Sequence, residues 1–295
     1  MFLRQKKDLS YKNLDLPSKN VLSGGNRFKE NYKNKNYFFS IVTVVLNNIN
    51  FLEETINSVI KQNIDVEYII IDGGSNDGTL DIIKKYENYI NLWISEKDEG
   101  IYDAMNEGIK YCTGKYIGMV NSSDLYSSNA LSIIKNYFNH NQNLDFIFGS
   151  VKKKKLKSGF KKNKIYWSFD FYPSHSSGFF ISNSAQKKLG LYNTDFKLSA
   201  DHDFFFRLIN NKYKGTSTKK DELIGHFRKV GGSYSSTFSF EEHFSEEISI
   251  RLNNKQNKFI ICLIIFNNYI RKIFKKKRYS ITLISTLKLV KNVFK

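Results

Sequence analysis

Residues 38–45 read FFSIVTVV, a nearly continuous run of apolar and β-branched side chains. Such a run is typical of a strand covered on both faces, because a half-exposed strand would alternate apolar and polar residues. Residues 51–62 follow with apolar side chains at helical spacing, EYIII at 67–71 resembles a second buried strand, and 79–86 resembles a second helix. Strand, helix, strand, helix at this spacing predicts a parallel sheet with right-handed crossovers.

The alternation continues through the middle of the chain. We predict further strands at 92–94, 116–120, 146–149 and 222–230, and helices at 102–111, 129–138, 201–210, 240–252 and 257–275. Residues 152–164 (KKKKLKSGFKKNK) contain eight lysines and are interpreted as a solvated hairpin or loop, with acceptor or lipid contact as the alternative. The expected fold class is α/β, with a Rossmann-like, mostly parallel sheet flanked by helices.

Charge divides the 295 residues, whose net charge is +18, into three parts. Residues 37–247 carry 25 basic and 25 acidic side chains, residues 1–36 carry 9 and 3, and residues 248–295 carry 12 and none. We predict a polar, basic and poorly ordered extension (1–36), an α/β domain (37–236) and a basic helical region (237–295). The neutral centre argues against a basic groove for nucleic acid.

The number of cysteines and the lengths of the apolar runs indicate the cellular compartment of the protein. Cys112 and Cys262 are the two cysteines, which excludes a disulfide scaffold or a cysteine zinc site and fits a reducing compartment. Residues 1–10 contain no apolar signal region, and the longest apolar run, residues 259–266, is far shorter than the ~20 residues of a spanning helix. We therefore expect a cytoplasmic protein.

Ligands of open α/β sheets lie at the carboxyl ends of the strands, so the residues there are the candidates for chemistry. The second strand runs into IDGGSNDGT at 71–79, where two glycines let backbone approach a ligand and Asp72 can accept hydrogen bonds from a base or ribose. The alternative is a tight turn with Ser75 or Asp77 capping the next helix, and for Asp77 we favour the cap.

Two more loops have the composition of a phosphate or metal site. The strand at 116–120 is followed by Asn121-Ser122-Ser123-Asp124, and a carboxylate at such a position can hold Mg²⁺ or Mn²⁺ together with substrate phosphate. The alternative for Asp124 is a helix cap. Residues 95–106 (SEKDEGIYDAMN) form a polar loop entering a helix, which suits contact with a phosphate or ribose.

Taken together, these blocks resemble the family 2 glycosyltransferases, inverting enzymes with the GT-A fold. The most specific blocks are IIIDGGSNDGT (69–79), ISEKDEGIYDAMNEGI (94–109) and SADHDFFFRL (199–208). They most resemble the branch that builds bacterial surface polysaccharides. The resemblance implies transfer of a sugar, with inversion, from a nucleotide-diphosphate sugar to a hydroxyl of a glycan acceptor that is expected to be lipid-linked.

The resemblance also implies roles for individual residues. The expected donor-binding residues are Thr43, Asn47, Asp72, Gly74, Asp98, Gly100, Asn106 and Arg228. Asp124 is the expected ligand of a divalent cation, Mn²⁺ or Mg²⁺, although Ser123 stands where the family usually has a second acid. His226 is a further candidate for the metal or diphosphate, and His175 for a place in the active site.

The catalytic base of the family usually lies in a Glu-Asp pair that opens a helix. Here the pair is Ala200-Asp201, so Asp201 is the expected base, with Asp203 as its rival and a helix cap as the alternative for Asp201. Inversion requires one in-line displacement, in which a carboxylate takes the acceptor hydroxyl proton and a cation stabilises the departing diphosphate. Asp201 and Asp124 satisfy this division.

The basic C-terminal region suggests a partner of another kind. A helix with an apolar stripe beside a Lys/Arg face lies in a membrane interface, so we predict peripheral binding to the anionic inner face of the cytoplasmic membrane. The alternative is packing of residues 259–266 on the catalytic domain or a second subunit.

Other classes of protein are compatible with parts of the sequence. A nucleotidyltransferase usually has a glycine-rich basic loop after its first strand, and residues 46–50 (LNNIN) have neither Gly nor Lys. A non-catalytic sugar-nucleotide-binding or assembly protein is favoured by Ser123 and Ala200. Nucleic-acid binding through the basic ends is disfavoured by the neutral centre.

Overall fold

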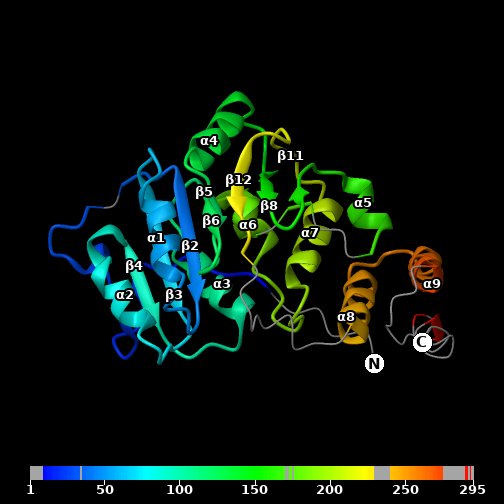
Figure 1. Cartoon of the computed structure of the whole chain (residues 1–295), viewed down its shortest axis with the longest axis horizontal. Coiled ribbons are helices and arrows are strands. Elements are labelled where there is room, and N and C mark those ends of the chain that lie inside the picture. Colours follow the sequence, from blue (N-terminus) through cyan, green and yellow to red (C-terminus); the bar gives the residue numbers. More distant parts are fainter. Residues whose placement is uncertain are drawn as a thin grey trace.

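The computed structural model describes residues 9–33, 35–169, 173–174, 176–228, 240–274, 290–291 and 293. In this part of the chain an eight-stranded sheet runs through the molecule and helices cover its two faces (Figure 1). The strands follow the order β1-β4-β3-β2-β5-β10-β7-β11.

The centre of the sheet consists of the four parallel strands that the sequence predicts. Their bounds are β2 (Phe39–Val45), β3 (Val66–Asp72), β4 (Leu92–Ser95) and β5 (Tyr116–Met119). Every residue of β2 is buried, since it has a strand on either side and helices on both faces. Its Ile41 and Val45 belong to one apolar cluster, and its Val42 and Val44 belong to another.

These two clusters are the two faces of the sheet. The first face is covered by α1 (Leu52–Ile60), α2 (Thr79–Lys85) and α4 (Ala130–His140). The second is covered by α3 (Ile101–Lys110) and α7 (Ala200–Asn210). Alternate residues of β2 thus pack against different helices, which explains why its sequence lacks polar alternation.

Beyond β5 the sheet becomes mixed. Strand β10 (Phe179–Ser182) lies antiparallel between β5 and β7 (Phe146–Phe148), and β11 (Gly215–Ser217) pairs parallel with β7. The sequence did not predict β10 or β11. The short helices of the described chain are α5 (Lys162–Trp167), α6 (Asn183–Leu189), η1 (Asn26–Phe28), η2 (Glu87–Tyr89) and η3 (Ser176–Gly178).

A second, four-stranded sheet has the order β6-β12-β8-β9. Its strands are β6 (Leu125–Tyr126), β12 (Leu223–His226), β8 (Ser150–Lys152) and β9 (Leu156–Lys157). The lysine-rich segment contains the turn and second strand of a hairpin, because β9 within it pairs antiparallel with β8, which ends at Lys152. Its last residues begin helix α5, which was not predicted and which buries Ile165.

The N-terminal extension is a correction to the sequence analysis. Residues expected to be poorly ordered include β1 (Leu22–Gly24), which pairs antiparallel with β4 at the edge of the main sheet. Arg27 then enters the interior, where its guanidinium donates to the carboxylate of Glu67 at 2.6 Å and to the carbonyl of Tyr111 at 2.7 Å. The segment is therefore part of the folded domain.

Two helices at the C-terminal end form a hairpin on the side of α7 (Figure 1). Helix α8 (Phe240–Asn253) and helix α9 (Lys258–Phe274) agree closely with the predicted bounds. Phe244 and Ile248 of α8 pack against Ile261 and Ile265 of α9. Among the described residues, none of the helices combines the length and the apolar character needed to cross a bilayer.

We expect Arg27→Ala to lower the free energy of unfolding by about 3 kcal/mol, because the fully buried Glu67 carboxylate loses its cationic partner. Lys35→Ala is the matched control: it removes an ion pair with Asp65 whose side chains are more than 60% exposed, which contributes below ~1 kcal/mol. Urea unfolding of both variants measures the difference. Equal losses in the two variants would show that the extension does not depend on the buried pair.

Candidate active site

The candidate residues gather where β2, β3, β4 and β5 end. These strands are parallel, so their carboxyl ends lie at one edge of the sheet. The chain passes from β2 to β3 and β4 on one side and returns to β5 on the other, which makes the gap between β2 and β5 the switch point of the topology. Open α/β sheets bind ligands in the crevice at such a point.

Asp72, the last residue of β3, is fully buried and shapes the loop that follows it. Its carboxylate accepts hydrogen bonds from the Ser75 hydroxyl at 2.5 Å, the Ser75 amide at 3.1 Å and the Ser95 hydroxyl at 2.6 Å. Ser95 ends the neighbouring strand β4. Asp72 therefore joins the loops after β3 and β4, and its contact with a donor stays a prediction.

Asp98 lies against Gly73, the residue that follows Asp72. A Cβ at Gly73 would collide with the Asp98 carboxylate, and Gly74 has a φ of 82°, which favours glycine. The same carboxylate accepts from the Gly100 amide at 2.9 Å. Burial, with the nearby charges of Asp103 and Asp72, raises the pKa of Asp98. The predicted donor residues of these two loops are thus in one place.

Asn47 and Asn48 connect the loop after β2 to its neighbours on both sides. Asn47 has a φ of 47°, a left-handed conformation that asparagine tolerates, and its amide donates to the Ser75 hydroxyl at 2.8 Å. Its side-chain oxygen accepts from the Asn76 amide at 2.9 Å. On the other side, the Asn48 side chain donates to the Ser122 hydroxyl at 2.8 Å, so the loops that flank the switch point are joined.

Asp124 and Arg228 meet at the end of β5. Asp124 is 1% exposed, and its carboxylate accepts from the Arg228 amide at 3.3 Å. The Arg228 guanidinium donates to the Ser123 carbonyl at 2.7 Å and to Glu54 at 2.6 Å, which ties the Asp124 loop to α1. His226 pairs with Leu125 in the adjoining sheet and so lies beside this cluster.

Thr43 and Asn106 have partners inside the protein. The Thr43 hydroxyl is fully buried and lies 3.0 Å from the Tyr68 hydroxyl. The Asn106 side chain donates to the Tyr192 carbonyl at 2.9 Å and accepts from the Tyr192 amide at 2.8 Å. Both residues thus hold the fold at the site, and their contacts with a donor stay predictions.

The two rival carboxylates, Asp201 and Asp203, have different surroundings. Asp203 is 4% exposed and engaged at both oxygens, by Arg207 at 2.8 Å and by the Asn254 side chain at 2.8 Å. Asp201 is half-buried, and its carboxylate accepts from the Tyr102 hydroxyl at 3.1 Å. Since Tyr102 follows the Gly100 loop directly, Asp201 lies beside the loops predicted to bind the donor, and Asp203 faces the protein interior.

Several residues of the site were not predicted as such. Tyr102 lies in the block at residues 94–109, but its contact with Asp201 spans 99 residues of sequence. No sequence pattern indicated that Ser75 and Ser95 bind Asp72 or that Glu54 binds Arg228. His175, a predicted active-site residue, lies outside the described residues.

The predicted metal site depends on which side chains near Asp124 could act as ligands. Within the described chain, no three His, Cys, Asp or Glu side chains come together as a group able to hold a metal ion. Asp124 offers one buried carboxylate beside the switch point. One protein carboxylate fits a cation such as Mg²⁺ or Mn²⁺ when substrate phosphates supply further oxygen ligands.

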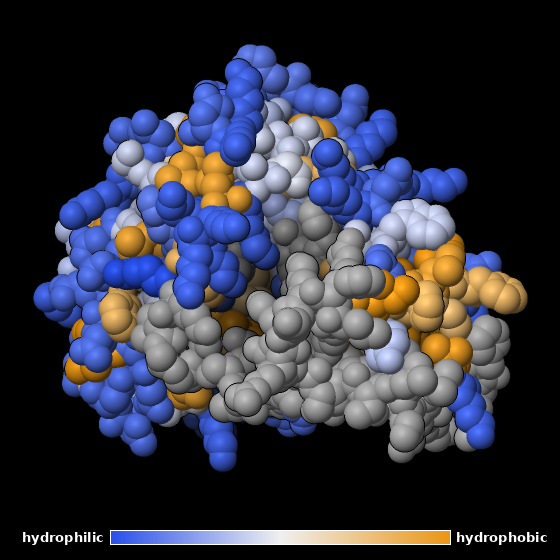
Figure 2. Space-filling view, turned by 45° about the vertical axis from the view of Figure 1, so that its right-hand side comes forward, coloured by the Kyte–Doolittle hydropathy of each residue, from blue (hydrophilic) through white to orange (hydrophobic). Residues whose placement is uncertain are grey.

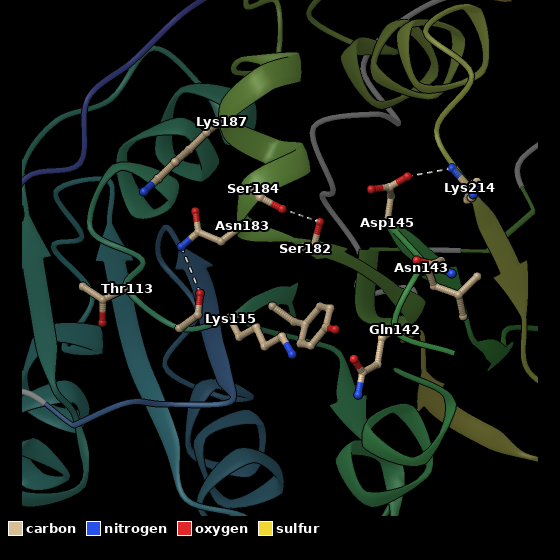
Figure 3. A pocket seen from close by; sticks show the side chains of 13 residues that line it. Thr113, Lys115, Gln142, Asn143, Asp145, Ser182, Asn183, Ser184, Lys187 and Lys214 are labelled. Carbon is tan, nitrogen blue, oxygen red and sulfur yellow. Dashed lines mark hydrogen bonds between the residues drawn. The ribbon is translucent and has the colours of Figure 1, made fainter. Parts of the chain in front are cut away.

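A cavity of about 670 Å³ lies elsewhere in the molecule (Figure 3). Lys115 at the start of β5, Asp145 before β7 and Ser182 at the end of antiparallel β10 line it, so it opens at the amino edge of the sheet. A second cavity of about 650 Å³ lies between α1 and β6, beside Glu54. The first cavity is thus at the edge opposite the candidate site, and the second adjoins it.

Comparison with known proteins gives a consistent result. The sequence profile of glycosyl transferase family 2 matches residues 40–212. A PGL/p-HBAD biosynthesis glycosyltransferase of Mycobacterium bovis is 26% identical over 182 residues, covering 59% of this chain and 70% of that protein. The minor teichoic acid biosynthesis protein GgaB of Bacillus subtilis is 26% identical over 221 residues, covering 69% of this chain and 24% of that protein.

Solved structures agree with the fold. TarS 1–349 of S. aureus in complex with UDP-GlcNAc has a TM-score of 0.60 at 18% identity, covering 77% of this chain and 71% of that one. The mannosyltransferase PcManGT of Pyrobaculum calidifontis, in complex with GDP-Man and Mn²⁺, has a TM-score of 0.56 at 12% identity, covering 88% and 80%. The predicted GT-A fold is confirmed.

Proposed function

Because this chain belongs to glycosyl transferase family 2, we propose that it transfers a sugar from a nucleotide-diphosphate sugar to a hydroxyl of a glycan acceptor, with inversion. The observation that carries the proposal is the contrast between the two rival carboxylates. Both carboxylate oxygens of Asp203 accept hydrogen bonds from Arg207 and Asn254, whereas Asp201 is partly exposed beside the donor loops. Relatives named for PGL and teichoic acid biosynthesis support a cell-surface glycan as the acceptor, and we propose that this glycan is lipid-linked.

The reaction divides between two ends of the site. The loops after β2, β3 and β4 receive the nucleotide, with Asp72 and Asp98 at the base or ribose. Asp201 takes the proton of the acceptor hydroxyl as its oxygen bonds to the anomeric carbon, and the bond from that carbon to the diphosphate oxygen breaks in the same displacement. The Tyr102 hydroxyl orients Asp201 for this role.

Asp124, with His226 beside it, would hold a divalent cation, Mn²⁺ or Mg²⁺, at the diphosphate end. When bound, the cation stabilises negative charge on the departing diphosphate. Arg228 supports the same end by holding Ser123 and Asp124 in place, since it donates to the carbonyl of one and the carboxylate of the other.

Asp201→Asn should nearly abolish transfer while nucleotide affinity stays unchanged, because the amide cannot take the acceptor proton. A fall of about 10²–10⁴ in kcat is expected for loss of a general base. Asp203→Asn is the comparison: it should lower the melting temperature, since it weakens a buried ion pair, and leave kcat much less affected. An active Asp201→Asn enzyme beside a dead but stable Asp203→Asn enzyme would reverse the assignment.

Donor affinity should fall when EDTA removes the cation, and Ser123→Asp should strengthen metal binding by adding a second carboxylate beside Asp124. Isothermal titration with UDP- and GDP-sugars, with Mn²⁺ or with chelator, measures both effects. Ser128→Asp adds the same charge at an exposed position of the next turn and serves as the control. Donor binding that is indifferent to EDTA would remove the cation from the mechanism.

The C-terminal hairpin supports a place at the anionic inner face of the cytoplasmic membrane. One side of α9 packs on α8, while Phe259, Leu263 and Phe266 on its other side are 72%, 61% and 56% exposed. Figure 2 shows apolar side chains gathered on the side of the molecule that carries α9. Residues 248–295 add 12 basic and no acidic side chains. Such a surface binds a membrane by apolar insertion and by about 1 kcal/mol per basic residue.

The full chain should float with vesicles containing anionic lipid and detach as salt rises. Replacing Phe259, Leu263 and Phe266 by serine should abolish flotation, because it removes the apolar face and leaves the charge unchanged. Tyr89→Ser is the control, since Tyr89 is a similarly exposed aromatic residue in η2. If the triple variant floats as well as the original chain, the exposed face of α9 does not bind the membrane.

A further inference from the structure

Helix α8 lies beyond the residues that match the family, yet it contacts the segment that carries Asp201. The two carboxylate oxygens of Glu246 accept from the amides of Lys197 and Leu198, at 2.5 and 2.9 Å. These amides belong to the loop just before α7, the helix that Asp201 opens. A side chain that binds two successive amides fixes the direction in which the following helix starts.

Further contacts from α8 and the turn after it hold the same segment. His243 lies 3.0 Å from the Ser199 hydroxyl, and Asn254 donates to Asp203 at 2.8 Å. Glu247 is fully buried with Arg251 at 2.8 Å and has the neutral ring of His202 at 3.5 Å, where burial lowers the histidine pKa. Residues 197–203 are thus attached to α8 along most of their length.

The opposite side of this segment faces the donor loops. The Tyr102 hydroxyl donates to Asp201 and lies 3.3 Å from the Leu198 carbonyl, and the Lys197 ammonium donates to the Glu99 carbonyl at 3.4 Å. Asp201 therefore stands between α8 and the loop at 96–100. The hydrogen bonds of Glu246 go to the backbone that precedes Asp201, so its effect on the reaction is expected to act through the position of the base segment.

We propose that Glu246 is a positioning residue for the catalytic base, so that α8 is a working part of the active site and not an appendage. This inference rests on the proposed role of Asp201. Glu246 holds the Lys197–Leu198 backbone, that backbone sets the start of α7, and the start of α7 aims the Asp201 carboxylate at the acceptor hydroxyl. Burial raises the pKa of Glu246, and the hydrogen bonds from the Leu198 and Lys197 amides offset part of this electrostatic cost.

Glu246→Ala should lower kcat by about 10–100-fold while the KM for the donor changes little, because a displaced base costs rate without altering the donor loops. Glu246→Gln retains one acceptor oxygen and should fall between Glu246→Ala and the original enzyme. Glu242→Gln, the same change at an exposed position of the same helix, should keep the original kcat. Thermal unfolding of each variant confirms that it is folded.

Two measurements separate positioning from a general loss of stability. In the Asp201→Asn background, Glu246→Ala should cause no further loss of kcat, since residues that act through one another are not additive. Hydrogen exchange at the amides of residues 197 and 198 should accelerate in Glu246→Ala and not in Glu242→Gln. Equal losses in both backgrounds, or unchanged exchange, would overturn the proposal. The exchange result stands even if no sugar transfer is found, so failure of the proposed function remains distinguishable.

Discussion

The parallel pairing of β2 with β3 and β5 is the constraint on which the rest of the molecule depends. Phe39–Val45 pairs in register with Val66–Asp72, and the first four residues of β2 pair with β5. This register brings the loops after β2, β3 and β5 to one edge of the sheet. A slip of one residue would exchange the two faces of β2, so that Val42 and Ile41 would each face the wrong helices. Core packing and site geometry are therefore fixed by the same pairing.

The first half of the fold could be predicted because its strands are buried on both faces. Continuous apolar runs such as 38–45 stand out from the helices between them, and the carboxyl-edge rule then places Asn47, Asp72, Asp98 and Asp124 together without further information. The lysine-rich hairpin was predictable for the opposite reason, since a run of like charges cannot be buried. The sequence left Asp203 as a rival to Asp201 for the role of catalytic base, because both carboxylates belong to one helix turn.

Other parts of the structure depend on contacts between residues far apart in the sequence, which no local sequence pattern indicates. The strand Leu22–Gly24 contains serine and glycine, and it forms only because β4 offers it an unpaired edge. Thr43 and Asn106 have hydrogen-bond partners, Tyr68 and Tyr192, that are 25 and 86 residues away in the sequence, so no local pattern could have indicated these contacts. Glu246 resembles a surface acid of a charged helix until its two backbone partners are seen.

The docked N-terminal segment has a consequence for synthesis of the chain. Arg27 leaves the ribosome before either of its partners, Glu67 and the carbonyl of Tyr111, has been made, and β1 emerges long before β4. This segment is translated before the residues it packs against and can therefore dock only after they have emerged, and until then Arg27 stays in water. Late closure of this kind involves contacts of large sequence separation, which slow folding and leave the β4 edge open to other strands. Residues 1–36 carry a net positive charge, and like charges next to an unpaired strand oppose its aggregation with other chains in the meantime.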